Sequence, residues 1–527
     1  MLLVADWFVR ARPDHPMADI KQAKKVISEL PATDSVKALE QICFWLDSIA
    51  DTDGFKTDLR FQLIDLLDQA AKNHQRKIRQ EYLTGQRLQK IRENVLWATA
   101  FRFWKLLGAS YSQCIEDFQS GANGSSAIKK QLSVIIARAL RALTLQLKWS
   151  LLRYGVIDDR IWGELGRLYS FAETQRNAMA TVEVYPGVHG RSSVRQEFLK
   201  AMMLSVSSTD ALNLLEQHIA ERAVARFGGR YVVQDQPGPG CTFLFDLSMR
   251  KPPVRVQNGV KPVGDVRYFG AGDATVGLAK LIAETRQKDG AQADVNPGGR
   301  CETGLVLEVL EHLALYWSDS PPSRSSERHK HTMRLTVAPS FNGLLKEIEA
   351  DADTDSLDFT QTESWIVEDV SGGGYGTVIP QVKGDWIRIG ALVGLQTEAG
   401  NCWHAGIIRR ISQQRRVGIQ LLSPFALGVV VSPASSDSSM ETGCEGDRAV
   451  LLSRNPDEHG EITLLLRSDT FRPNQNLDMQ VRDTNYLLLP SKLIERGDDF
   501  DCAQFAITQR CYGSQPKADM QQIAIPA

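Results

Sequence analysis

The sequence predicts a multidomain α+β protein with a helical N-terminal part, a mixed middle region and a β-rich C-terminal part. Turn-forming residues are unevenly distributed, because residues 1–222 hold only 10 of the 40 glycines and 4 of the 21 prolines. Apolar residues recur at helical spacing in this first part, whereas short β-type runs dominate the C-terminal part. A chain of 527 residues that is 43% apolar is long enough for three or four folded domains.

Residues 1–222 are predicted to form an all-α helical bundle. The first clear helix carries apolar residues at helical spacing from Val36 to Leu46 and follows two capping candidates, Thr33 and Asp34. Further helices are predicted at Asp58–Ala71, Ile78–Leu107, Ser126–Tyr154 and Asp158–Ala172. No fixed-period repeat is present, so a bundle is favoured over a tetratricopeptide-like array.

Residues 223–317 are predicted to form a mixed α/β region. A helix at Asp210–Phe227, with Thr209 as its cap, leads into this region and stops at a glycine pair. Two short β-type runs and two helices are expected beyond the glycine pair, at Tyr231–Val233, Thr242–Leu247, Ala274–Arg286 and Thr303–Trp317.

Residues 318–425 and 426–527 are predicted to be two β domains. A linker rich in Ser and Pro, Ser318–Arg328, precedes the first of them. Strands are predicted at Thr332–Ala338, Glu363–Glu368, Thr377–Ile379, Leu392–Thr397, Trp403–Ile411, Arg416–Leu421, Asp447–Leu452, Glu461–Leu466 and Asn485–Leu489. That number of strands fits two consecutive β barrels or sandwiches.

Composition excludes several classes of protein. The 61 basic and 63 acidic residues give a net charge of −2, which argues against a dedicated partner of duplex nucleic acid. The most apolar long segment, Leu132–Leu152, contains Arg138, Arg141 and Lys148, so we expect a core helix and no membrane span. The eight cysteines are scattered without Cys-x-x-Cys spacing, and residues 1–12 lack a signal-peptide pattern. We expect a cytoplasmic protein with reduced thiols and no structural zinc.

The sharpest local motif is the run from Asp369 to Gly376, which has the sequence DVSGGGYG and lies between two predicted strands. Four glycines and a short polar pair, Asp369 and Ser371, make a turn whose backbone amides can approach an oxyanion or the edge of a base. On its own such a run is more often a plain hairpin loop. Its meaning therefore depends on a second motif.

The second motif is a pair of arginines, Arg324 and Arg328, four residues apart in the linker before the first strand. A guanidinium group binds phosphate oxygens through two parallel hydrogen bonds and stacks on purine faces. Two arginines in a linker are usually solvated, so the pair gains weight only from its position before the β domain that carries Asp369.

In this order, the two motifs resemble the PilZ family of bacterial cyclic di-GMP receptors. That family carries Arg-x-x-x-Arg before a β barrel, matched here by Arg324 and Arg328, and Asp/Asn-x-Ser-x-x-Gly on it, matched by Asp369, Ser371 and Gly374. The later runs WIRIGALV, WHAGIIRR and RVGIQLL, which begin at residues 386, 403 and 416, look like the family's later barrel strands. The resemblance covers about residues 321–425, roughly a fifth of the chain.

The resemblance implies binding of cyclic di-GMP, a nucleotide with two phosphates and two guanine bases. Arg324 and Arg328 would clamp phosphate and stack on guanine. Asp369 would accept hydrogen bonds from the guanine N1–H and N2–H₂ edge, Ser371 would contact base or phosphate, and Gly374 would allow close backbone approach. The expected role is recognition of a ligand, with no catalytic residue and no cofactor.

Other motifs that could indicate a dinucleotide, metal or hydrolase site lack residues that such a site needs. Gly270 and Gly272 lack the third glycine of a dinucleotide fingerprint because Thr275 stands in its place, so a tight turn with Asp273 capping the next helix is favoured. Glu308, Glu311 and His312 lack a second ligand helix for a metal pair. His329 and His331 also lack further metal ligands, and Ser371 has no Gly-x-Ser-x-Gly elbow of a hydrolase.

The sequence thus favours a cytoplasmic bacterial signalling receptor that binds cyclic di-GMP and acts through ligand-dependent domain contacts or contacts with a protein partner, which the sequence does not identify. The alternative is a PilZ-like adaptor that has lost nucleotide binding and serves only in protein interaction. A third class, an enzyme with its site near Asp273, is disfavoured because no catalytic constellation accompanies it.

Overall fold

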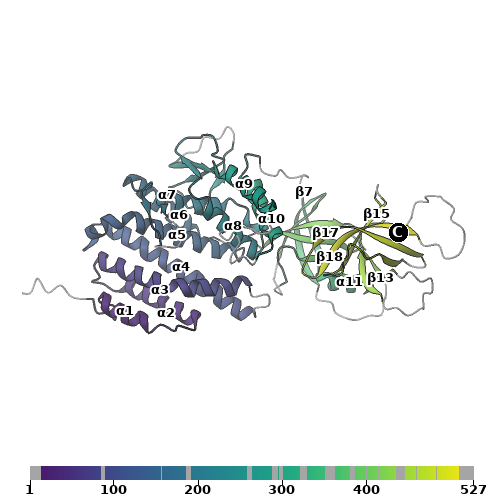
Figure 1. Ribbon diagram of the computed structural model, residues 1–527, viewed down its shortest axis with the longest axis horizontal. Coiled ribbons are helices and arrows are strands. Elements are labelled where there is room, and N and C mark those ends of the chain that lie inside the picture. The colour runs from purple at the N-terminus through teal and green to yellow at the C-terminus, as the bar shows by residue number, and fades with distance from the viewer. Residues whose placement is uncertain are drawn as a thin grey trace, which may run out of the picture. The chain divides into compact units, whose positions relative to one another are not determined.

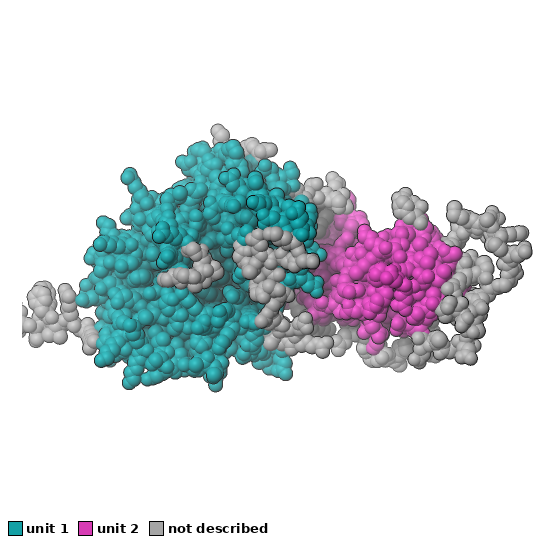
Figure 2. All heavy atoms as spheres, in the orientation of Figure 1, with its two compact units in different colours: residues 1–323 teal, residues 324–527 magenta. Residues whose placement is uncertain are grey.

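The computed structural model describes residues 13–84, 89–155, 157–185, 191–257, 264–287, 295, 301–320, 329–350, 362–379, 386–398, 400, 402–412, 415–434, 446–457, 460–481 and 484–509. The chain folds into two compact units, residues 1–323 and 324–527 (Figure 2). Helices with a small sheet make up the first unit, and two β barrels make up the second. The predicted multidomain α+β class is therefore confirmed. The finer four-part division stays a prediction.

The first unit begins with long helices that lie side by side (Figure 1). They are α1 (Ile20–Ser28), α2 (Ser35–Asp51), α3 (Thr57–Thr84), α4 (Lys90–Gln119), α5 (Leu132–Leu151), α6 (Asp159–Thr174), α7 (Val194–Ser205) and α8 (Leu214–Arg226). The Asp34 carboxylate accepts the backbone N–H of Lys37 at 3.1 Å, which confirms the predicted cap of α2. The single helix predicted at Ile78–Leu107 is wrong, since α3 ends at Thr84 and α4 begins at Lys90.

The last helix of the bundle, α8, starts later than predicted. Thr209 does not cap it, because Thr209–Ala211 form a separate 3₁₀ turn. Asn213 caps α8 instead and forms a reciprocal capping box with Glu216, in which each side chain accepts the other residue's backbone N–H. The Asn-x-x-Glu spacing at this point was the available sequence signal.

The middle region packs on the helices and shares their core. Its strands are β3 (Val232–Gln234), β4 (Phe243–Asp246), β5 (Val254–Arg255) and β6 (Val266–Gly270), in the sheet order β3-β6-β4-β5, followed by α9 (Ala274–Gln287) and α10 (Thr303–Trp317). A two-stranded ribbon, β1 (Thr181–Val182) with β2 (Ser192–Ser193), precedes α7. The ring of Phe245 lies 5.8 Å from that of Phe198 in α7, an edge-to-face contact that joins sheet to bundle.

Helix α5 runs through the centre of the first unit and buries charged residues as well as apolar ones. Lys148 donates to Glu221 and to Nδ1 of His218, each at 2.7 Å. Burial and the neighbouring Lys148 lower the pKa of His218 to about 4, so the ring is neutral at pH 7. None of the described helices is long and apolar enough to cross a lipid bilayer.

A second buried ionic cluster surrounds Glu197 of α7. Its carboxylate accepts hydrogen bonds from Arg141 at 2.9 Å, Lys200 at 2.7 Å and Ser192 at 2.6 Å. Burial alone would raise the pKa of Glu197, but the two cations and the hydroxyl lower it to about 2. The cations of α5 are therefore paired inside the unit.

The second unit consists of two closed antiparallel barrels of six strands each. The first barrel contains β7 (His329–Pro339), β8 (Glu363–Ser371), β9 (Gly374–Val378), β10 (Leu392–Thr397), β11 (His404–Ser412) and β12 (Arg416–Ser423), in the order β10-β11-β12-β9-β8-β7. The second contains β13 (Leu427–Pro433), β14 (Asp447–Leu451), β15 (Glu461–Arg467), β16 (Leu477–Val481), β17 (Thr484–Arg496) and β18 (Phe500–Gln509). The sequence left barrels or sandwiches open for the β-rich part, and both sheets close into barrels. The elements β13, β16, β18 and α11 were not foreseen.

Helix α11 (Ser340–Ala350) joins the two barrels. It packs on β7 and β10 of the first barrel and on β13 of the second. Phe341 of α11 is buried in one apolar cluster with Trp403 of the first barrel and Phe500 of the second. The carboxylate of Asp499 accepts the backbone N–H of Phe341 at 2.7 Å. This shared core makes the two barrels one compact unit.

Candidate functional site

The motif predicted from the sequence forms the β8–β9 hairpin of the first barrel. Asp369 and Ser371 end β8, and Gly374 opens β9. Ser371 is the direct partner of Gly374 across the hairpin and donates a hydrogen bond from its hydroxyl to the Gly374 carbonyl at 3.3 Å. Two exposed glycines, Gly372 and Gly373, form the turn between them. The structure therefore brings the three predicted residues together.

Asp369 faces Gly376 across the two strands. A Cβ atom on Gly376 would lie 2.4 Å from Oδ1 of Asp369, so the carboxylate occupies the space above this glycine. Any larger residue at position 376 would displace the carboxylate. The sequence prediction placed Gly376 among the four glycines of the turn, whereas the structure places it in β9, opposite Asp369.

Gly374 has a structural reason to be glycine. Its φ is +148°, and a Cβ atom there would lie 1.9 Å from the carbonyl oxygen of Ile419 in β12. The lack of a side chain at Gly374 thus lets the backbone of β9 approach the backbone of β12. Close approach of a ligand at this position stays a prediction, whereas nothing lies within 4 Å of a Cβ built on Gly373.

A strip of two glycines extends from Asp369 across the outer face of the barrel. Gly376 of β9 pairs with Gly418 of β12, and Gly418 pairs with Arg410 of β11. The neighbours of both glycines along their strands are buried, so the glycines themselves face outward. We call Gly376 and Gly418 the glycine strip. The Asp369 carboxylate covers Gly376, and the bare backbone of Gly418 lies between this carboxylate and the Arg410 side chain.

The first residues of β7 lie beside the same hairpin. His329 pairs with Val370 and Lys330 pairs with Asp369, so the basic start of β7 lies next to the acidic end of β8. Lys330 is exposed. The start of β7 and the end of β8 are far apart in the sequence, because the 40 residues between Arg328 and Asp369 contain β7 and α11. They lie side by side in the barrel because β7 and β8 pair antiparallel.

Arg324 and Arg328, the predicted phosphate clamp, lie outside the described residues. Arg328 directly precedes His329 in the sequence. His329 pairs with Val370 across β7 and β8. Val370 stands between Asp369 and Ser371 in the sequence. The sequence had marked Lys330, between His329 and His331, only as part of a basic segment that could add charge beside a phosphate. Arg410 was not predicted as a site residue, and the alternation of residues along β11 was the available signal.

The described part of the chain holds no cluster of three or more His, Cys, Asp and Glu side chains that is arranged for a metal ion. Near Asp273, the place of the disfavoured enzyme hypothesis, packing accounts for the glycines. A Cβ atom on Gly270 would lie 2.1 Å from the carbonyl oxygen of Gly240, and one on Gly272 would lie 3.1 Å from that of Arg230. These glycines allow the β3–β6 turns to pack closely.

Comparison with known families gives one match. Residues 21–237 match the family described as "Cyclic-di-GMP receptor FimW, N-terminal domain". The matched stretch begins in α1 and ends just after β3, so it lies wholly in the first unit and does not include the barrels. Comparisons with curated proteins and with solved structures gave no match.

Proposed function

We propose that this chain is a cyclic di-GMP receptor and that the ligand binds on the outer face of the first barrel, which we infer to be PilZ-like. The observation that carries the proposal is the glycine strip, with Asp369 at one side and Arg410 at the other. Support comes from two separate segments. The family matched by residues 21–237 is described as a cyclic di-GMP receptor, and the motif residues lie in the other unit.

The chemistry of the strip suits a guanine base. At Gly418 the backbone carries no side chain, which allows a flat ring to approach to van der Waals distance beside the Asp369 carboxylate. The Asp369 carboxylate offers two acceptor oxygens to the N1–H and N2–H₂ donors of a guanine edge, and Ser371 offers a hydroxyl beside it. Lys330, next to Asp369, adds positive charge for a phosphate. Arg324 and Arg328 complete the proposed site as the phosphate clamp.

In this proposal the chain acts as a receptor or effector and performs no catalysis. Binding would order the segment that carries Arg324 and Arg328 against the hairpin and so change contacts between domains or with a protein partner. Signalling by cyclic di-GMP would place the chain in the bacterial cytoplasm. The ligand is bound without a cofactor and released unchanged.

Calorimetric titration of the full chain tests the proposal. Cyclic di-GMP should bind at micromolar concentration or below, and GTP and the linear dinucleotide pGpG should bind at least tenfold more weakly. Asp369→Asn, which keeps the shape of the side chain and removes its charge, should weaken cyclic di-GMP binding about tenfold or more. Asp47→Asn, which changes a carboxylate of α2 paired with Arg102, should have no effect.

Absence of binding by a folded sample would refute the receptor proposal. It would favour the adaptor hypothesis, in which the barrel keeps its fold and serves only in protein interaction. Equal binding of cyclic di-GMP by the parent and by Asp369→Asn would instead place the ligand elsewhere in the chain.

A further inference from the structure

A cavity of about 570 Å³ opens in the first unit beside the C-terminal end of α6. Its walls come from α6, from the segment that follows α6, from α7, and from strands β3 and β6. A volume of this size is in the range of small-molecule sites. The cavity is formed entirely by the first unit and is separate from the hairpin of Asp369.

Three arginines from three different elements line this cavity: Arg176 after α6, Arg195 in α7 and Arg267 in β6. Arg195 makes only weak contacts with the protein, since its guanidinium lies 3.4 Å from the Met179 sulfur and 3.5 Å from the Tyr231 carbonyl oxygen. Within the described ranges, neither Arg176 nor Arg195 forms an ion pair with a carboxylate. Among the residues that the structure describes, no carboxylate therefore compensates these two guanidinium charges.

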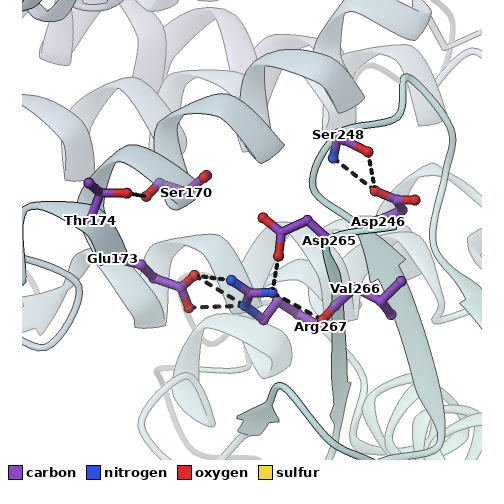
Figure 3. Close-up of polar contacts among 8 residues, drawn as sticks. All are labelled: Ser170, Glu173, Thr174, Asp246, Ser248, Asp265, Val266 and Arg267. Carbon is purple, nitrogen blue, oxygen red and sulfur yellow. Dashed lines mark hydrogen bonds and ion pairs between the residues drawn. The ribbon is translucent and has the colours of Figure 1, made fainter. Parts of the chain in front are cut away.

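Arg267 lines the cavity with its side chain held in place by two carboxylates. Its guanidinium donates to both carboxylate oxygens of Glu173, the closer at 2.6 Å, and to Asp265 at 2.5 Å (Figure 3). Two carboxylates therefore neutralise and orient this one arginine. The other acidic residue that lines the cavity, Asp235, is exposed. The protein thus supplies charge compensation for Arg267 and leaves Arg176 and Arg195 for an external anion.

Arg176 occupies a position where glycine is favoured. It is the first residue past α6 in the left-handed conformation, with φ +56°, and it closes the helix through hydrogen bonds from Arg176 N to Glu173 O and from Asn177 N to Ala172 O. Such a position usually carries glycine, because a Cβ atom is strained there. An arginine at this position therefore supplies its side chain at a cost in conformational energy.

We propose that this cavity binds the phosphate group of a small phosphate ester through Arg176 and Arg195, with the paired Arg267 as part of the cavity wall. A guanidinium fork matches two phosphate oxygens, and the forks of Arg176 and Arg195 come from two separate elements. This is a second anion site, in the unit that does not contain the barrel. It does not depend on cyclic di-GMP binding at Asp369.

Titration calorimetry of the full chain with inorganic pyrophosphate tests the inference, in the parent and in the Asp369→Asn background. Binding should saturate at about 1 mM or below in both. Arg195→Ala should weaken it tenfold or more, and Arg195→Lys should restore part of the loss, because Lys keeps charge without the fork. Arg176→Gly should also weaken binding, while its melting temperature should equal or exceed that of the parent because the strain is relieved. Arg286→Ala, which removes an exposed arginine of α9, is the control.

No saturation by about 10 mM pyrophosphate would overturn the inference. An equal loss in Arg286→Ala would overturn it too, because the effect would then reflect general surface charge. A last titration uses hexaglutamate, whose carboxylates represent an acidic protein segment. If hexaglutamate binds with a dependence on Arg195 and pyrophosphate does not, the cavity takes carboxylates of a protein segment, and the phosphate assignment is wrong. Because the Asp369→Asn background leaves the cavity intact, failure here is distinguishable from failure of the barrel site.

Discussion

The carboxylate of Asp369 occupies the space that a side chain on Gly376 would fill, since a Cβ atom there would lie 2.4 Å from Asp369 Oδ1. The two residues are direct partners across β8 and β9. The observed position of the Asp369 carboxylate, and with it the recognition proposed for Asp369, therefore requires glycine at position 376. A side chain at position 376 would displace only the end of a rotatable side chain. A substitution there should therefore disturb the site and leave the barrel folded.

Gly376→Ala should weaken cyclic di-GMP binding about ten- to a hundredfold, because the Asp369 carboxylate must rotate away and its charged hydrogen bonds to the ligand are lost. The barrel should remain folded. Calorimetry gives the affinity, and hydrogen exchange of barrel peptides gives the fold. Gly343→Ala, in α11, is the matched control, because its Cβ would make only ordinary contacts at 3.6 Å. Unchanged affinity in Gly376→Ala would remove Asp369 from the site.

Gly374→Ala should instead destabilise the first barrel. The new Cβ would lie 1.9 Å from the Ile419 carbonyl oxygen, and the φ of +148° is one that residues other than glycine rarely adopt. We expect a loss of about 2 kcal/mol or more in local stability, seen as faster hydrogen exchange in β9 and β12. Exchange rates equal to those of the parent would show that the barrel tolerates a side chain here.

Arg328→Ala should weaken cyclic di-GMP binding roughly ten- to a hundredfold without altering the fold, as expected for one charged phosphate contact of about 1.5–3 kcal/mol. Arg328→Lys should recover only part of the affinity, since Lys lacks the planar fork. Arg334→Ala is the comparison, because Arg334 is an exposed residue of β7 paired with Ile366. If Arg334→Ala loses affinity and Arg328→Ala does not, Arg328 is not the phosphate clamp and Arg334 takes its place.

Acid should destabilise the first unit through His218. Its pKa is about 4 in the folded protein and near 6.5 when unfolded, so the unfolded state binds more protons between these values. The free energy of unfolding does not depend on His218 above about pH 6.5. It falls by up to about 3 kcal/mol as the pH drops from 6.5 to 4. Thermal unfolding followed by circular dichroism at 222 nm, at a series of pH values, measures this slope.

His218→Gln should flatten that slope between pH 4 and 6.5, because the amide does not titrate. His329→Gln, which changes an exposed histidine of β7, should leave it unchanged. Below pH 4.5 both variants should still lose stability, because the pKa of Glu197 is lowered to about 2 and its ion pairs with Arg141 and Lys200 are lost as it protonates. A parent-like slope in His218→Gln would contradict this assignment.

The two barrels should fold better together than apart. The sequence led us to expect that Pro321–Pro424 folds alone as a β barrel, and this stays a prediction. The shared cluster modifies it, because Phe341, Leu392 and Trp403 would lose their buried partners Leu465 and Phe500. A segment comprising residues 321–510 should therefore be monomeric and melt at a higher temperature than residues 321–424. Equal melting temperatures would show that the interface contributes little.

Local signals were enough for many elements. Asp34 was found as a cap from its position before an apolar helical pattern, and the bounds of α10 and β10 agree with their predicted ranges. Prediction failed where neighbours in space decide the outcome. β18 and α11 were not predicted, yet they hold Phe500 and Phe341 in the core between the barrels. The break between α3 and α4 carried no proline to mark it.

Local patterns predicted the α+β class, a β-rich C-terminal part and the grouping of Asp369, Ser371 and Gly374 at one turn, because periodicity and turn chemistry act over a few residues. Closure of both sheets into barrels, and the residues that face each other across strands, followed from the folded structure. The partners of Asp369, Lys330 and Gly376, follow from the registers of β7 and β9, and Gly418 joins the strip from a strand about fifty residues away in the chain. Likewise, Arg176, Arg195 and Arg267 meet at one cavity only through packing. Register and packing depend on closure of the whole sheet and burial of the whole core, which no local pattern encodes.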